Sequence, residues 1–181
     1  MRCAPASTAE SPVVFTLGHS RHPIADFVAL AACHGIETVV DVRGQPWSRF
    51  NPQYNREPFR AALAAAGIGY RWEGERLSGR PRDSRFYRPD GGLDLPAVRA
   101  WPAFAQGLDE IGALAAETRI ALVCAEEDPI RCHRRFLLTP PLIERKVDVR
   151  HIRKDGRIET EAAVVARARG DGNARQQDLF G

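Results

Sequence analysis

The sequence predicts a single α/β domain with a mainly parallel, doubly wound, Rossmann-like sheet flanked by helices. Short apolar runs alternate with longer segments of helical periodicity, which is typical of βαβ units. At 181 residues, 44% of them hydrophobic, the chain is long enough for one sizeable core. The predicted domain spans residues 13–168 and includes a long arginine-rich insert and a small C-terminal hairpin.

Three strands and two helices are predicted in the first half of the chain. The strands are short buried runs, and the first helix has apolar residues at i, i+3, i+4 and i+7 from Ile24. Asn55 is expected to cap the second helix and Gly67 to close it. In chain order these elements are strand 13–17, helix 23–34, strand 38–42, helix 56–66 and strand 68–72.

The second half is predicted to contain two further strands, three helices and a hairpin. Pro102 is expected to break the first of these helices, and Pro140–Pro141 to interrupt the helix after the fourth strand. Asp155–Gly156 is typical of a tight turn, which places the hairpin after the fifth strand. In chain order these segments are the irregular insert 73–95, helix 96–117, strand 120–124, strand 147–152 and helix 161–168.

Composition excludes several classes of protein. No apolar run approaches the length of a membrane span, and residues 1–12 lack the apolar core of a signal peptide. We therefore expect a cytoplasmic protein with no membrane partner. Four dispersed cysteines do not form a small-domain disulfide pattern, and a net charge of +3 does not by itself indicate nucleic acid. Residues 1–12 are expected to be a loose leader, and 169–181 a flexible tail.

Polar and ionisable side chains follow three of the predicted strands. Because the carboxyl ends of parallel strands meet at one edge of a sheet, we expect these side chains to form one site. The set also includes three polar residues of the loop after the second strand. Its members are His19, Ser20, Asp41, Arg43, Ser48, Arg49, Asn51, Cys124, Glu126, Cys132, His133 and Arg134.

Two catalytic chemistries fit the corner after the fourth strand. In the first, Cys124 is a nucleophile whose thiolate is stabilised by the dipole of the next helix and by nearby arginines. Against this, the three acids of 126–128 oppose a thiolate, and six residues separate Cys124 from Arg131, where the phosphatase pattern has five. In the second, Glu126 or Glu127 is a general acid–base, with His19 or His133 moving protons. A purely structural network of arginines and carboxylates is the alternative to both.

A metal site or a redox pair is a further interpretation of the same corner. Cys124, Glu126, Cys132 and His133 are acceptable metal ligands, with His19 as a further candidate, and the two cysteines are candidates for a disulfide. Their spacing matches no closed zinc module, however, so the sequence predicts neither a metal nor a cofactor.

Arginines in the insert suggest a nucleic-acid partner. Arg80, Arg82 and Arg85 are expected to contact phosphates, and Tyr87 to stack on bases. A solvated lid over the site is the alternative.

The end of the chain resembles the bacterial sliding-clamp-binding peptide. That peptide usually has the form Gln-Leu-Ser/Asp-Leu-Phe, whereas this chain has Gln-Gln-Asp-Leu-Phe at 176–180. The predicted partner-binding residues are Gln176, Asp178, Leu179 and Phe180, with the last two as apolar anchors. An end without a partner is the alternative.

The motifs together resemble those of the domain of unknown function 488 family. They are Thr16-Leu-Gly-His-Ser20, Asp41-Val-Arg43, Ser48-Arg49 with Asn51-Pro52, and Cys124-Ala-Glu-Glu-Asp-Pro with Cys132-His-Arg134. The resemblance covers about 13–152 and implies a compact α/β fold, but it supplies no established activity. Our leading hypothesis is an enzyme that acts on nucleic acid or a nucleotide-like anionic substrate, associated with DNA repair. The alternatives are a non-catalytic nucleic-acid or metabolite binding module, or a thiol-redox or metal-binding protein.

Overall fold

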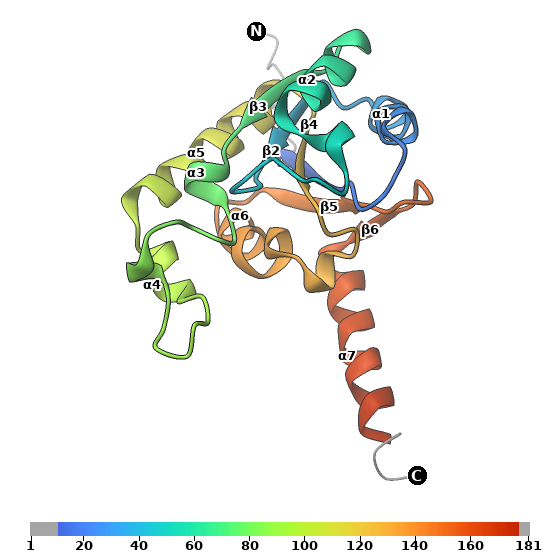
Figure 1. Cartoon of the computed structure of the whole chain (residues 1–181). Coiled ribbons are helices and arrows are strands. Elements are labelled where there is room, and N and C mark those ends of the chain that lie inside the picture. The colour runs from blue at the N-terminus through green and yellow to red at the C-terminus, as the bar shows by residue number, and fades with distance from the viewer. Residues whose placement is uncertain (1–10, 178–181) are drawn as a thin grey trace, which may run out of the picture.

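A six-stranded sheet with helices on both faces confirms the predicted fold class. The structure is a computed structural model that describes residues 11–177, with side chains described as far as residue 170. The strands lie in the order β3-β2-β4-β1-β5-β6 (Figure 1). All neighbouring pairs are parallel except β5 and β6, which form the predicted hairpin. The strands are β1 (Val13–Gly18), β2 (Thr38–Asp41), β3 (Gly69–Trp72), β4 (Ile120–Cys124), β5 (Asp148–Ile152) and β6 (Ile158–Thr160).

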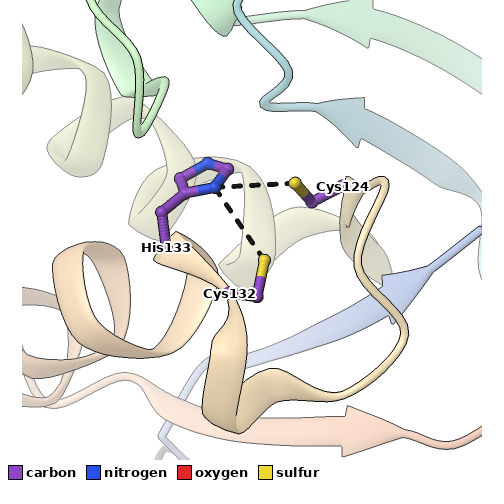
Figure 2. A group of neighbouring side chains, drawn as sticks. All are labelled: Cys124, Cys132 and His133. Atoms are coloured by element: carbon purple, nitrogen blue, oxygen red, sulfur yellow. Dashed lines mark hydrogen bonds between the residues drawn. The ribbon is translucent and has the colours of Figure 1, made fainter. Parts of the chain in front are cut away.

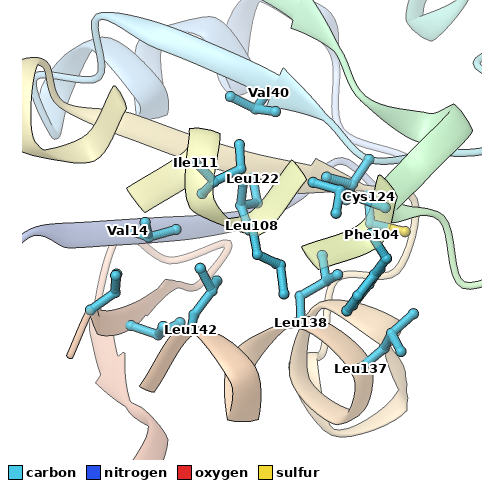
Figure 3. Packing of buried hydrophobic residues seen from close by; sticks show 14 of the residues in the cluster. Val14, Val40, Phe104, Leu108, Ile111, Leu122, Cys124, Leu137, Leu138 and Leu142 are labelled. Carbon is cyan, nitrogen blue, oxygen red and sulfur yellow. The ribbon is translucent and has the colours of Figure 1, made fainter. Parts of the chain in front are cut away.

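Two hydrophobic clusters, one on each face of the sheet, form the core between the sheet and the helices that cover it. Helices α1 and α2 pack on one face, where their aromatic residues meet Val39 and Val123. Helices α5 and α6 pack on the other, against Val40 and Leu122 (Figure 3). Since successive strand residues point to opposite faces, adjacent valines of β2 serve different cores. The helices are α1 (Ile24–Cys33), α2 (Arg56–Ala65), α3 (Gly74–Leu77), α4 (Leu95–Arg99), α5 (Pro102–Glu117), α6 (Thr139–Glu144) and α7 (Glu161–Gln177).

The insert 73–95 is less irregular than the sequence predicted. It contains α3 and a 3₁₀ turn, Ser84–Phe86, which begins where the Asp83 side chain accepts a hydrogen bond from the Arg85 backbone N–H. The predicted break at Pro102 is present, because α4 ends at Arg99 and α5 begins at the proline. A short helix and a capped 3₁₀ turn therefore give the insert regular structure.

The prediction that Asn55 caps α2 is wrong. Asn55 precedes the helix, but its side chain makes no capping hydrogen bond. Its Oδ1 instead accepts from the backbone N–H of Ser48 at 2.6 Å, which ties the preceding loop together.

Pro140 and Pro141 lie in the first turn of α6, which they therefore do not interrupt. A π-helical turn, Arg134–Leu138, leads into this helix. Pro140 has no N–H for the carbonyl of Phe136, four residues before it, and the Arg99 side chain donates to that carbonyl at 2.9 Å.

Helix α7 is longer than predicted. It continues to Gln177, so the backbone of 169–177 is helical where the sequence predicted a flexible tail. Gln176 lies in its last turn, and Asp178, Leu179 and Phe180 of the predicted clamp peptide lie outside the described residues, as do residues 1–10 of the leader. Among the described residues, no helix combines the length and hydropathy of a membrane span.

Candidate active site

The ends of β1, β2 and β4 meet at one edge of the sheet, as their parallel arrangement requires. The backbone N–H of His19 donates to the carbonyl of Cys124 at 2.9 Å, and that of Ser20 to the carbonyl of Ala125 at 2.8 Å. On the other side of β4, the N–H of Val42 donates to the Val123 carbonyl at 3.1 Å. Three segments that are far apart in the sequence are therefore fixed together by their backbones.

Gly18 allows this close approach. A Cβ at residue 18 would overlap the carbonyl oxygen of Glu126 and the Cα of Glu127, both of which are backbone atoms that cannot swing aside. Glycine at the end of β1 thus lets the corner after β4 fold over the first strand. Ser20 follows in a left-handed conformation, with φ of 43°, at the turn into α1.

A buried ion pair joins the ends of β2 and β1. Arg43 donates to both carboxylate oxygens of Asp41, from Nε at 2.8 Å and from Nη2 at 2.6 Å. Tyr70 donates a further hydrogen bond to Asp41 at 2.8 Å. The remaining nitrogen of Arg43, Nη1, donates to His19 Nε2 at 3.1 Å.

His19 is held as a neutral ring. It stacks on Tyr54 with a centroid distance of 4.1 Å, and its Nδ1 lies 3.0 Å from the carbonyl of Ser20. Burial, together with the nearby Arg43 charge, lowers the pKa of His19 to about 4. Both ring nitrogens have partners, so His19 positions Arg43 and does not match the proton-moving role predicted from the sequence.

Cys124, Cys132 and His133 form a compact cluster at the end of β4 (Figure 2). His133 Nδ1 lies 3.5 Å from the sulfur of Cys124 and 3.9 Å from that of Cys132. Both cysteines are free and buried, and Cys124 is 8% exposed.

The two thiols are linked by a hydrogen bond that shifts their pKa values in opposite directions. A hydrogen bond from Cys132 lowers the pKa of Cys124 to about 6 against the opposing effect of burial, and the positive charge of Arg134 and the N–H groups of residues 125 and 126 add to this shift. The same hydrogen bond and burial raise the pKa of Cys132 to about 12. These opposite shifts in pKa favour the thiolate at Cys124 over Cys132.

Arg134 lies behind the cysteines and supplies the opposite charge. It is 1% exposed, and none of the carboxylates in the described part of the chain forms an ion pair with it. Its Nε donates to the sulfur of Cys132 at 3.0 Å, and its Nη2 donates to the backbone carbonyl of Glu126. A guanidinium stays charged even when buried, so Arg134 favours the thiolate form of the neighbouring cysteines by lowering their pKa. The sequence placed Arg134 among the substrate-binding groups, which its burial contradicts.

The acids of the corner do not oppose the thiolate as the sequence suggested. Glu127 accepts two hydrogen bonds from Arg153, at 3.0 and 2.9 Å, and Asp128 is paired with Arg167. Glu126 remains exposed at the wall of the site. Only this carboxylate is thus placed for the predicted acid–base role.

The prediction that a helix dipole stabilises the thiolate of Cys124 is also wrong. Pro129 begins a short 3₁₀ turn, Pro129–Arg131, and Cys132 is in an extended conformation after it. The N–H groups of Ala125 and Glu126, which point at the sulfur of Cys124, stabilise the thiolate in place of a helix N-terminus.

A cleft of about 560 Å³, here called the cysteine cleft, opens above this cluster. Cys124, Cys132 and His133 line it together with Arg43 and Glu126. Eight further lining residues were not predicted as site residues, although tryptophan in a polar loop and arginine three residues from Asp128 are visible signals. These are Gly44, Gln45, Trp47, Ser78, Gly79, Ala125, Arg131 and Phe136.

The predicted loop residues stand outside the cleft lining. The hydroxyl of Ser48 accepts from the N–H groups of Phe50 and Asn51, both at 3.2 Å, which makes a local turn. Arg49 is exposed and lies over the ring of Phe50 at 4.6 Å. Ser48 and Asn51 therefore shape the loop, contrary to the predicted substrate contacts.

The predicted nucleic-acid residues divide into two groups. Arg80 and Arg82 are exposed and line the cysteine cleft. Arg85 pairs with Asp83 at 3.0 Å and is not among the cleft residues, and the hydroxyl of Tyr87 donates to the Pro81 carbonyl at 2.8 Å. Only the first two arginines face the cysteines.

The cysteine cluster has the ligand types of a soft-metal site. The three ligand atoms of Cys124, Cys132 and His133 lie within 4.8 Å of one another, and thiolate with imidazole suits zinc or copper(I). Arg134, in hydrogen-bond contact with Cys132, places a positive charge where it opposes a cation.

The fold and site define a single-domain α/β protein with a cysteine–histidine cluster at the carboxyl edge of its sheet. The chain belongs to the family described as Domain of unknown function DUF488, whose family model matches residues 23–139. This confirms the resemblance inferred from the motifs. Neither the curated proteins nor the solved structures contain a match.

Proposed function

We propose that this protein is an enzyme that acts on nucleic acid or a nucleotide-like anionic substrate, with Cys124 as its nucleophile. The position of Cys124 carries the proposal: it lines the cysteine cleft together with Arg43, its sulfur lies 3.5 Å from His133 Nδ1, and the buried charge of Arg134 is nearby. A thiolate beside a histidine and facing a basic cleft is the usual arrangement of a cysteine nucleophile.

The reaction that fits this geometry is a two-step displacement. The sulfur of Cys124 forms a bond to an electrophilic atom of the substrate while the bond to the leaving group breaks. The leaving group takes a proton from His133, whose Nδ1 is 3.5 Å from the sulfur. Water then attacks the same atom, returns a proton to His133 and breaks the bond to sulfur, which regenerates the thiolate. Glu126 is placed to orient that water.

The charge of the cleft supports an anionic substrate. Arg43 uses three of its five N–H groups on Asp41 and His19 and keeps two for the cleft that it lines. A role in DNA repair and the clamp-binding peptide at 176–180 belong to the same proposal, since the peptide would bring such an enzyme to replicating or damaged DNA.

Dithiol redox chemistry is the second candidate, favoured by the hydrogen bond between the two cysteines. In that case Cys132 would attack a mixed disulfide on Cys124 and release the substrate as a thiol. Such a protein would form a reversible disulfide between Cys124 and Cys132 and would show no preference for an anionic reagent.

Paired alkylating reagents test the proposal. Peptide mapping would give the rates at which iodoacetate, an anion, and iodoacetamide, its neutral analogue, label each cysteine. We expect the ratio of the iodoacetate rate to the iodoacetamide rate to be about tenfold higher at Cys124 than at the exposed Cys33, since a basic cleft concentrates anions. Arg80→Gln with Arg82→Gln should lower the ratio at Cys124 alone. Equal ratios at the two cysteines would contradict an anion-binding site.

A further inference from the structure

Two large aromatic side chains at the cysteine cleft are exposed to solvent. Trp47 is 70% exposed and Phe136 is 41% exposed, and both line the cleft. Apolar rings of this size usually pack into a core, and exposed ones beside a polar cleft mark a binding surface. Trp47 follows the end of β2 by six residues, so the buried pair of Asp41 and Arg43 anchors the start of its loop.

Three exposed arginines of the cleft have no ion-pair partner among the described residues, whereas the buried Arg43 is paired with Asp41. Arg80, Arg82 and Arg131 are exposed, and no carboxylate of the described chain forms an ion pair with any of them. Elsewhere in the insert, Arg76 is bound to Glu110 and Arg88 to Asp90. The insert thus satisfies its structural arginines and leaves those at the cleft available for an external anion.

Cleft size restricts the form of that anion. About 560 Å³ suits a nucleotide-sized ligand, and Cys124 lies low in the wall with 8% of its surface exposed. A duplex keeps its bases stacked and its reactive atoms out of reach of such a group, whereas a single strand offers separate bases and phosphates.

We propose that the cysteine cleft binds single-stranded nucleic acid, with one base stacked on Trp47 and the adjoining phosphates held by Arg80, Arg82 and Arg131. This inference rests on the function proposed above, because it names the class of substrate that the proposed enzyme would bind. Aromatic platforms beside unpaired arginines are the common solution for binding single strands without reading their sequence. Phosphate contacts of this kind make the affinity fall as salt rises.

Fluorescence anisotropy with the full chain and a labelled single-stranded oligonucleotide tests the inference. Trp47→Ala should weaken binding about tenfold, the effect of losing one stacked base. Phe50→Ala is the matched control, because Phe50 is on the same loop and 77% exposed but does not line the cleft. Trp47→Phe should restore most of the affinity. Arg80→Gln with Arg82→Gln should weaken binding and flatten its salt dependence.

Inorganic polyphosphate separates stacking from simple charge attraction. It has phosphates but no bases, so its competition with the oligonucleotide should be sensitive to the arginines and insensitive to Trp47. Equal losses for Trp47→Ala and Phe50→Ala, equal sensitivity of polyphosphate to Trp47, or tighter binding of duplex than single strand would each overturn the inference. Cys124→Ser should bind the oligonucleotide normally, so a failure of the thiol chemistry and a failure of binding would be told apart.

Discussion

Cys124→Ser is expected to lower turnover by about a thousandfold or more, the usual effect of removing a nucleophile. A serine hydroxyl stays protonated near neutral pH, and the cluster around Cys124 is built to stabilise a thiolate. Three groups favour an anion at residue 124: His133 at 3.5 Å, the hydrogen bond from Cys132 and the charge of Arg134. In the serine variant they have no thiolate to stabilise. The measurement is turnover of a panel of nucleotides and single-stranded oligonucleotides, with products separated by chromatography.

Cys33→Ser is the control for this variant. Cys33 is an exposed thiol at the end of α1, remote from the cleft, and its replacement should leave turnover unchanged. A Cys124→Ser protein that keeps most of its activity would contradict a nucleophilic role for the thiol. Glu126→Gln would then be the informative variant, because Glu126 is the remaining carboxylate at the cleft wall.

Asp41→Asn is expected to lower the free energy of unfolding by about 3–5 kcal/mol, the cost of leaving a buried charge without its partner. Asp41 is fully buried and accepts three side-chain hydrogen bonds, two from Arg43 and one from Tyr70. The neutral amide removes the charge that balances Arg43 and presents a donor where an acceptor is needed. Urea unfolding followed by circular dichroism measures the change.

Asp148→Asn provides the comparison for the ion pair. Asp148 pairs with Arg150 at 2.7 Å in the same sheet, but both side chains are 42% exposed. Water and salt screen this pair, so its loss should leave the urea midpoint almost unchanged. Equal midpoints for the two variants would show that the pair of Asp41 and Arg43 does not stabilise the fold.

The sequence was sufficient to predict the sheet and the edge of the sheet at which the site forms. Apolar runs fixed the strands, and the rule that parallel strands share a carboxyl edge brought His19, Asp41 and Cys124 together. These are consequences of local pattern and of chirality, both of which can be inferred from a single chain.

Burial of individual side chains could not be predicted in the same way. Arg134 looks like a substrate ligand beside Cys132 and His133, yet it points inward, where its Nη1 lies 3.5 Å from Thr16 Oγ1, 118 residues away in sequence. Exposure of Trp47 depends equally on which segments pack around it. Such properties arise from the tertiary fold and leave no periodic signal in the chain.

The prediction for the corner after β4 was wrong for a different reason. The sequence predicts a helix next to Cys124, but Asp128 caps the N–H of Ile130 in a 3₁₀ turn that begins at Pro129, and the chain is extended again at Cys132. Proline fits the first turn of either structure, so local chemistry alone did not distinguish them. The consequence is functional, since the thiolate is stabilised by backbone N–H groups and by Cys132 instead of by a helix.

Titration of the thiolate by its ultraviolet absorbance tests the central claim most directly. The thiolate of Cys124 should appear as pH rises, with a midpoint at about pH 6, and should be almost fully formed near neutral pH. The step should be absent from Cys124→Ser, and Cys33→Ser should retain it. If the wild-type protein instead shows thiolate only at about pH 8.5, the range of an ordinary cysteine, Cys124 is not an activated nucleophile and the proposed function is wrong.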